Sequence, residues 1–124
     1  MINKDKTLLF FLLYCLPFFC FSDEKTVACR IEITTPERAL YKGDCEIHRE
    51  GRGTFTLWAP HPENHPPIFE DMSTITVFVV NRNKAKVSGM TTDGIQNTWG
   101  DAIRSKSDAG CWTGPDFQVC AWRR

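Results

Sequence analysis

Three histidines are the side chains of this 124-residue chain best suited to bind a metal or to move a proton near neutral pH. His61 and His65 are four residues apart, a spacing that would bring two ligands together on one face of a helix. Four prolines interrupt residues 59–67, so a helix is excluded there and the spacing loses that meaning. His48 is expected on the outer side of a strand. The histidines therefore predict no metal site.

Other arrangements that support catalysis or cofactor binding do not occur in the sequence. It has no Gly-x-Ser-x-Gly turn and no glycine-rich phosphate loop. Glu70 and Asp71 are adjacent carboxylates, but neighbours in an extended chain point apart, unlike the facing pair of a glycosidase. The sequence favours a protein that is not an enzyme and has no cofactor. Catalytic residues that converge from separate loops remain the alternative.

An export signal is predicted at the N-terminus. Lys4 and Lys6 precede an uncharged run over residues 7–21, and cleavage is expected after Ser22. The run is shorter than the roughly 20 apolar residues that a spanning helix needs. Residues 1–22 are therefore expected to be removed. The mature chain, residues 23–124, is expected to be a single domain in the periplasm, with secretion as the alternative.

The charge balance argues against a polyanionic partner. The whole chain has 15 basic and 15 acidic residues, so no overall field would attract nucleic acid or an anionic membrane. The expected partner is a protein, with no nucleic acid and, once the leader is removed, no membrane. The expected state is a monomer or a 1:1 heterodimer.

Four cysteines remain after the leader. They are Cys29, Cys45, Cys111 and Cys120. In a small exported domain, four cysteines are expected to form two disulfides. The first two are equidistant from Glu37, the expected centre of a hairpin, and the last two are symmetric about residues 115–116. Residues opposite each other on paired strands are close enough for a bridge, so we predict Cys29–Cys45 and Cys111–Cys120. A zinc site would need closer spacing.

Alternating apolar and polar residues predict strands along most of the mature chain. The expected strands cover residues 27–33, 41–47, 54–58, 75–80, 84–90, 111–113 and 117–122. Residues 91–109 have no clear pattern, and residues 101–106 are expected to form at most one short helix. Six to seven short antiparallel strands joined by tight turns predict an all-β fold, either a small barrel or a sandwich.

The connection over residues 59–72 is the main candidate for a partner-binding surface. It is long and proline-rich, and long loops in compact domains are usually functional or disordered. Its apolar residues beside acids would suit a cleft lined with basic groups, or would fold back and cap the barrel. Its candidates are His61, Glu63, His65, Ile68, Phe69, Glu70, Asp71 and Met72. A second candidate surface, near residues 91–100, contributes Met90, Asp93 and Trp99, although Trp99 also suits the core.

A pattern of glycine, cysteine and aromatic residues spans most of the mature chain. It consists of Tyr41-x-Gly43-x-Cys45, Gly53-x-Phe55, Trp99-Gly100, Gly110-Cys111-Trp112-x-Gly114 and Cys120-Ala121-Trp122. This pattern resembles small exported proteins of Gram-negative bacteria. Some of those proteins are encoded beside type VI secretion toxins that attack peptidoglycan, including L,D-transpeptidase-like toxins.

The resemblance implies a periplasmic immunity protein that binds such a toxin and occludes its active site. The matched residues are bridges, turn glycines and core tryptophans, so none of them identifies the target. Three alternatives remain open from the sequence. They are a lysozyme inhibitor, a secreted effector or adhesin module, and a small secreted hydrolase.

Overall fold

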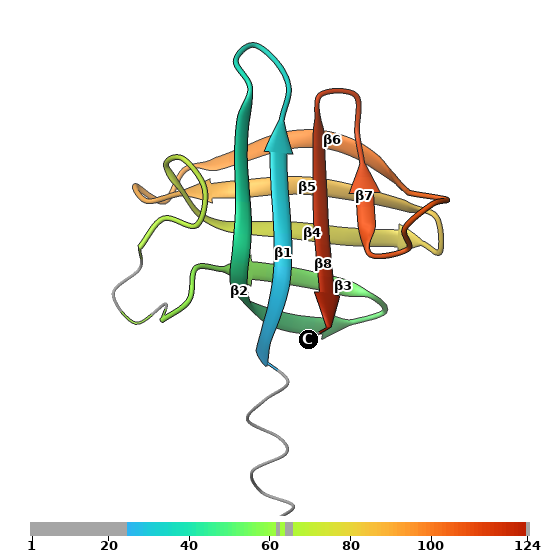
Figure 1. Cartoon of the computed structure of the whole chain (residues 1–124), viewed down its shortest axis with the longest axis horizontal. Helices are drawn as coiled ribbons and strands as arrows, with labels where there is room; N and C mark the ends of the chain where they lie inside the picture. The colour runs from blue at the N-terminus through green and yellow to red at the C-terminus, as the bar shows by residue number, and fades with distance from the viewer. Residues whose placement is uncertain (1–24, 62, 64–65, 124) are drawn as a thin grey trace, which may run out of the picture.

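The computed structural model describes residues 25–61, 63 and 66–123. These residues form a closed antiparallel barrel of eight strands in chain order (Figure 1). The strands are β1 (Thr26–Ile33), β2 (Ala39–Gly51), β3 (Thr54–Trp58), β4 (Met72–Asn81), β5 (Lys84–Thr91), β6 (Gln96–Arg104), β7 (Cys111–Thr113) and β8 (Phe117–Arg123). The predicted leader and His65 lie outside the described residues.

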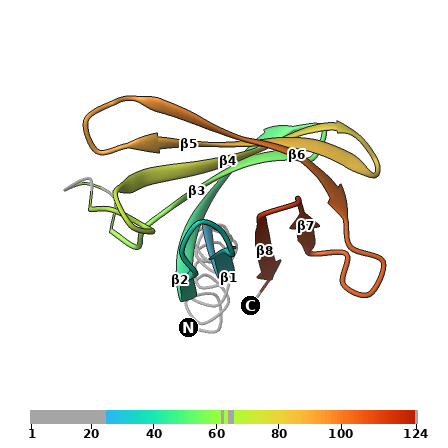
Figure 2. The same ribbon diagram turned by 90° about the horizontal axis from the view of Figure 1, so that it is seen from above.

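The barrel consists of two layers whose strands run across one another (Figures 1 and 2). Strands β3 to β6 form one layer, and β1, β7 and β8 belong to the other. The long strand β2 connects them, because residues 39–46 pair with β1 and residues 46–51 pair with β3. Pairing of β8 with β1 closes the barrel. This arrangement leaves the outer side of β4, β5 and β6 as one broad face.

Apolar side chains at alternate strand positions fill the interior. In β1, Val27, Cys29 and Ile31 point inward and are at most 2% exposed. The register carries the same alternation around the barrel, so inward positions on neighbouring strands lie beside one another. The core includes Cys45, Leu57, Ile75, Val77, Ala85, Val87, Ala102, Trp112, Phe117 and Val119. An eight-stranded barrel has an interior that side chains can fill, as they do here.

The all-β class and the barrel alternative are confirmed, but the predicted strand number of six to seven is wrong because there are eight. The missing strand is β6, and the short helix expected over residues 101–106 does not form, since residues 101–104 are strand. The sequence signal is weak because β6 turns small residues inward, with Gly100 half-buried and Ala102 only 2% exposed. Strands β2 and β4, with 13 and 10 residues, are also longer than expected.

Both predicted disulfides are present, and one differs in geometry from the expectation. Cys111 lies directly opposite Cys120, with a Cα–Cα distance of 4.0 Å. Cys29, however, lies opposite Gly43, while Cys45 lies opposite Val27. The first bridge is therefore diagonal, with a Cα–Cα distance of 6.0 Å. The expected register was wrong by two residues. A disulfide can still form across this offset, because 6.0 Å lies within the usual Cα–Cα range of a disulfide.

Candidate functional site

The apolar residues of the predicted binding loop are buried. Ile68 and Phe69 are 4% exposed, and Met72 is 7% exposed. The Phe69 ring meets the Trp99 ring edge-on at 6.2 Å, and Trp99 in turn meets Phe117 at 5.6 Å. This chain of rings joins the loop to the barrel core. Of the two sequence interpretations, folding back onto the barrel is therefore the one found, and these apolar side chains are not available to a partner.

The exposed part of the same loop is a two-residue acidic turn. The Met72 N–H donates a hydrogen bond to the Phe69 carbonyl oxygen at 2.8 Å, closing a turn over Glu70 and Asp71. Glu70 has a positive φ of 53°, as expected inside a tight reversal. Both acids are exposed, and the residues on either side of them are buried. The turn is thus a rigid acidic tip with apolar anchors on both sides.

The neighbouring β5–β6 turn lies against this tip. The Thr92 N–H donates to the Asp71 carbonyl oxygen at 2.9 Å, and the Ser73 hydroxyl donates to the Met90 carbonyl oxygen at 3.1 Å. Asp93 is exposed in that turn. No lysine or arginine occurs in residues 53–81 or 87–103. We call this region the acidic end, defined by Glu70, Asp71 and Asp93.

The other predicted candidates are spread around the acidic end. His61 and Glu63 are exposed, and the His61 Nδ1 lies 3.9 Å from the Glu63 carboxylate, a pair that is ionic only when the histidine is protonated. Met90 is 40% exposed on the outer side of β5. The fold thus brings Glu70, Asp71 and Asp93 together on the surface but puts Trp99 into the aromatic contact with the core.

The opposite end of the β3–β6 layer is basic. Arg52 lies in the β2–β3 turn, Arg82 in the β4–β5 turn and Lys84 at the start of β5, and all three are exposed (Figure 1). Within the described residues, these three side chains form no ion pair. Arg52, Arg82, Phe78 and Val80 line one hollow together with Glu50, whose carboxylate accepts a hydrogen bond from Thr56 at 3.2 Å. We call this region the basic end, defined by Arg52, Arg82 and Lys84.

Arg104 lies at the same end but has a structural role. Its guanidinium stacks over the Trp112 ring, 4.3 Å from the centroid. Its Nε donates to the Arg82 carbonyl oxygen at 2.9 Å, and its Nη1 donates to the Ala109 carbonyl oxygen at 2.8 Å. These contacts fix the short β6–β7 junction, so Arg104 is not counted among the free cations.

Between the two ends, the outer sides of β4, β5 and β6 form matched rows. The central row is Thr76, Ser88 and Thr98. A groove of about 480 Å³ runs over this row, with Phe78 and Lys86 toward the basic end and Met90 toward the acidic end. Five large apolar side chains are exposed on or beside this face. They are Phe78 (57%), Val80 (54%), Met90 (40%), Ile95 (63%) and Ile103 (59%).

Four of these five residues, all but Met90, were not identified as surface residues from the sequence. The run over residues 75–80 is almost continuously apolar, which is typical of a strand covered on both sides. Only one side is covered: Ile75 and Val77 are fully buried, whereas Phe78 and Val80 are more than half exposed. Strict alternation within the run would have identified the outward pair.

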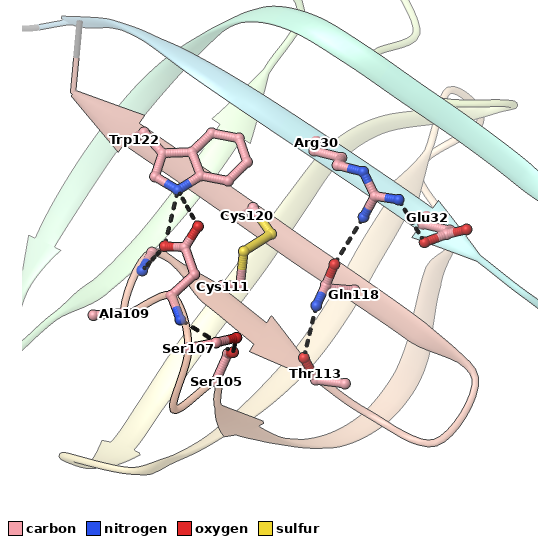
Figure 3. Close-up of a disulfide and its surroundings, with 12 residues drawn as sticks. Arg30, Glu32, Ser105, Ser107, Ala109, Cys111, Thr113, Gln118, Cys120 and Trp122 are labelled. Carbon is pink, nitrogen blue, oxygen red and sulfur yellow. Dashed lines mark hydrogen bonds and ion pairs between the residues drawn. A yellow bond between two sulfur atoms is a disulfide. The ribbon is translucent and has the colours of Figure 1, made fainter.

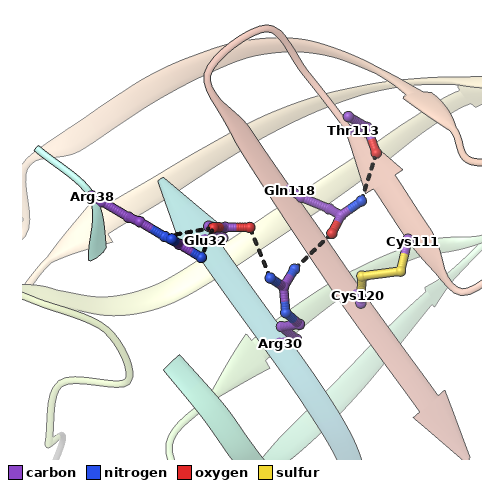
Figure 4. A network of polar contacts seen from close by, with 7 residues as sticks. All are labelled: Arg30, Glu32, Arg38, Cys111, Thr113, Gln118 and Cys120. Atoms are coloured by element: carbon purple, nitrogen blue, oxygen red, sulfur yellow. Dashed lines mark hydrogen bonds and ion pairs between the residues drawn. A yellow bond between two sulfur atoms is a disulfide. The ribbon is translucent and has the colours of Figure 1, made fainter. Parts of the chain in front are cut away.

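The outer face of β7, β8 and β1 is held together by internal polar contacts (Figures 3 and 4). Arg30 donates to Gln118 at 2.7 Å and to Glu32 at 2.9 Å, and Gln118 donates to Thr113 at 3.0 Å. On the other side of the Cys111–Cys120 bridge, the Trp122 indole N–H donates to both Asp108 carboxylate oxygens at 2.9 and 3.0 Å. These side chains hydrogen-bond to one another, so we assign this face a role in stabilising the fold.

Among residues 25–61, 63 and 66–123, no three His, Cys, Asp or Glu side chains are grouped to hold a metal ion. No helix in this part of the chain is long and apolar enough to cross a membrane. In comparisons with known proteins, the chain matches no family model, no curated protein and no solved structure.

Proposed function

We propose that this protein is an exported inhibitor of the immunity type, which binds a peptidoglycan-acting toxin and blocks its active site. The pattern of cysteines, glycines and tryptophans that resembles periplasmic immunity proteins motivates the proposal. The two disulfides are consistent with an oxidising, exported compartment. The barrel interior is filled with side chains, which favours binding by the outer surface over catalysis in a cavity.

The observation that carries the proposal is the rigid acidic tip at Glu70 and Asp71. Phe69 and Met72 anchor it in the core on both sides, so little conformational entropy is lost when the tip enters a cleft. Two carboxylates on a fixed turn are complementary to a cleft lined with basic groups. The proposed partner is therefore an enzyme whose substrate cleft is positively charged, and the inhibitor excludes substrate by occupying that cleft.

The test is a charge reversal at the tip. We expect Glu70→Lys with Asp71→Lys to weaken binding to the proposed cognate toxin by about tenfold or more, because like charges would then face each other. Isothermal titration calorimetry measures the affinity, and growth of cells that export the toxin measures protection.

The matched control is Glu37→Lys with Asp116→Lys, which makes the same change of net charge in the β1–β2 and β7–β8 turns. This control is expected to bind as the unmodified protein does. Equal affinity of both variants would place the interface away from the tip. Inhibition of added lysozyme by the unmodified protein, without toxin binding, would favour the lysozyme-inhibitor alternative.

A further inference from the structure

The outer face of β4, β5 and β6 has opposite charges at its two ends and exposed apolar side chains near both. We propose that this face is self-complementary and that a second copy of this chain docks on it, with its strands running in the opposite direction. The proposal does not rest on the toxin-binding function. Because docking would cover the acidic tip, self-association and toxin binding would exclude each other.

The two ends of the face have opposite charge. The basic end presents Arg52, Arg82 and Lys84 with no ion-pair partner in the described structure, and the acidic end has no lysine or arginine. On this face, the described cation with an acidic partner is Lys86, whose Nζ lies 3.4 Å from Asp101. The two ends are therefore separated charges of opposite sign on one rigid layer.

Exposed apolar side chains lie near both ends. Phe78 and Val80 lie beside the basic end, where they share a hollow with two cations, Arg52 and Arg82, and one acid, Glu50. Met90 lies toward the acidic end, and Ile95 is exposed in the turn beyond it. Removing an exposed apolar side chain from water lowers the free energy. Each end of the face has one group of such side chains, which can cover the group at the opposite end of a second copy.

Two copies can be related by a two-fold axis that pairs the opposite ends. A two-fold axis between the faces, perpendicular to the strands at the central row, places each end of one copy over the opposite end of the other. Arg82 and Lys84 then lie over the acids, and Phe78 lies over Thr74 and Met90. The threonine and serine hydroxyls of the central row meet their own counterparts. By symmetry, the contact of the cations with the acids and the contact of Phe78 with Thr74 and Met90 each occur twice in the dimer.

The same polarity disfavours an anionic polymer or bilayer as the occupant. A phosphate-rich surface would be attracted to three cations at one end of the face and repelled by the acids at the other. A second copy is attracted at both ends. Of these surfaces, the copy is the one whose charges are complementary at both ends of the face.

The experiment is sedimentation equilibrium of the mature, oxidised protein over a wide concentration range at low and high salt. We expect a monomer–dimer equilibrium that weakens with added salt, because the end contacts are ionic and exposed. Two charge-reversed variants test the orientation. One is Arg52→Glu with Arg82→Glu and Lys84→Glu, and the other is Glu70→Lys with Asp71→Lys and Asp93→Lys.

Each variant alone has like charge at both ends and is expected to be monomeric, with a dissociation constant raised by about tenfold or more. An equimolar mixture of the two is expected to restore association as a 1:1 heterodimer. Circular dichroism checks that both variants are folded, and Glu37→Lys with Asp116→Lys should dimerise as the unmodified protein does. A monomer at every concentration, or a mixture that does not associate, would overturn the proposal without touching the toxin-binding one.

Discussion

The two disulfides join adjacent strands in the same topology, yet they lie on opposite sides of the barrel wall. Cys29 and Cys45 point inward, are at most 1% exposed and belong to the core. Cys111 and Cys120 are also buried, at 5% and 1% exposed, but they are outside the core cluster and lie between the Arg30 and Trp122 contacts on the outer side of the wall (Figure 3). The inner bridge is both a cross-link and core packing. The outer bridge is a cross-link buried on the other side of the wall, among polar neighbours.

The largest effect is expected when the inner bridge is removed. Cys29→Ala with Cys45→Ala should lower the free energy of unfolding by about 3 kcal/mol through loop-closure entropy. Loss of two buried sulfur atoms should add roughly 1 kcal/mol each, because the barrel wall cannot collapse into the space. Urea denaturation followed by tryptophan fluorescence measures the change, and the m-value should rise as the unfolded chain expands.

Removal of the outer bridge is expected to cost less. The loop closed by Cys111 and Cys120 has a sequence separation of 9, against 16 for the inner bridge, so the chain-entropy contribution is smaller by about 0.5 kcal/mol. Cys111→Ala with Cys120→Ala also removes buried sulfur atoms, but they lie outside the main core cluster, so less core packing is lost. The same urea titration orders the two variants. A larger loss for the outer bridge would show that the inner one has no packing role.

The smallest effect is expected at the edge of the outer bridge. Trp122→Phe removes the indole N–H that donates to Asp108, and should cost about 1 to 2 kcal/mol because the acceptor is charged. Arg38→Ala is the control, since its side chain is 70% exposed where it pairs with Glu32. That change should stay within about 0.5 kcal/mol in thermal unfolding. Equal losses in both variants would contradict a structural role for Trp122.

Most strands of the fold could be predicted because one face of each is buried and its pattern alternates. β1 is the clearest case, with Val27, Cys29 and Ile31 inward and Arg30 and Glu32 at the alternate positions. β6 could not be predicted because its inward positions include Gly100 and Ala102, whose small side chains give little hydrophobic contrast. The Cys29–Cys45 pairing could be predicted although the predicted strand register was wrong. Symmetry about a turn determines which residues face each other only to within a few positions.

The candidate site was predicted in part. Glu70, Asp71 and Asp93 are exposed and lie at one end of the barrel, as a surface site requires. The sequence could not determine that Ile68 and Phe69 turn inward, because a proline-rich loop has no periodicity that assigns its faces. It also could not reveal the basic end, whose turns are about 30 residues apart and meet only when β3 and β4 pair.

The sequence by itself determined the all-β class and the partners of the four cysteines, because alternation and symmetry about turns are local properties of the chain. Only the tertiary structure decided which side of the barrel wall each bridge occupies, how many strands close the barrel, and which apolar residues remain outside. Those outcomes depend on strand register and closure, which bring distant segments together. The charge separation between the two ends of the β3–β6 layer has the same origin, since it is made by turns that are far apart in the chain.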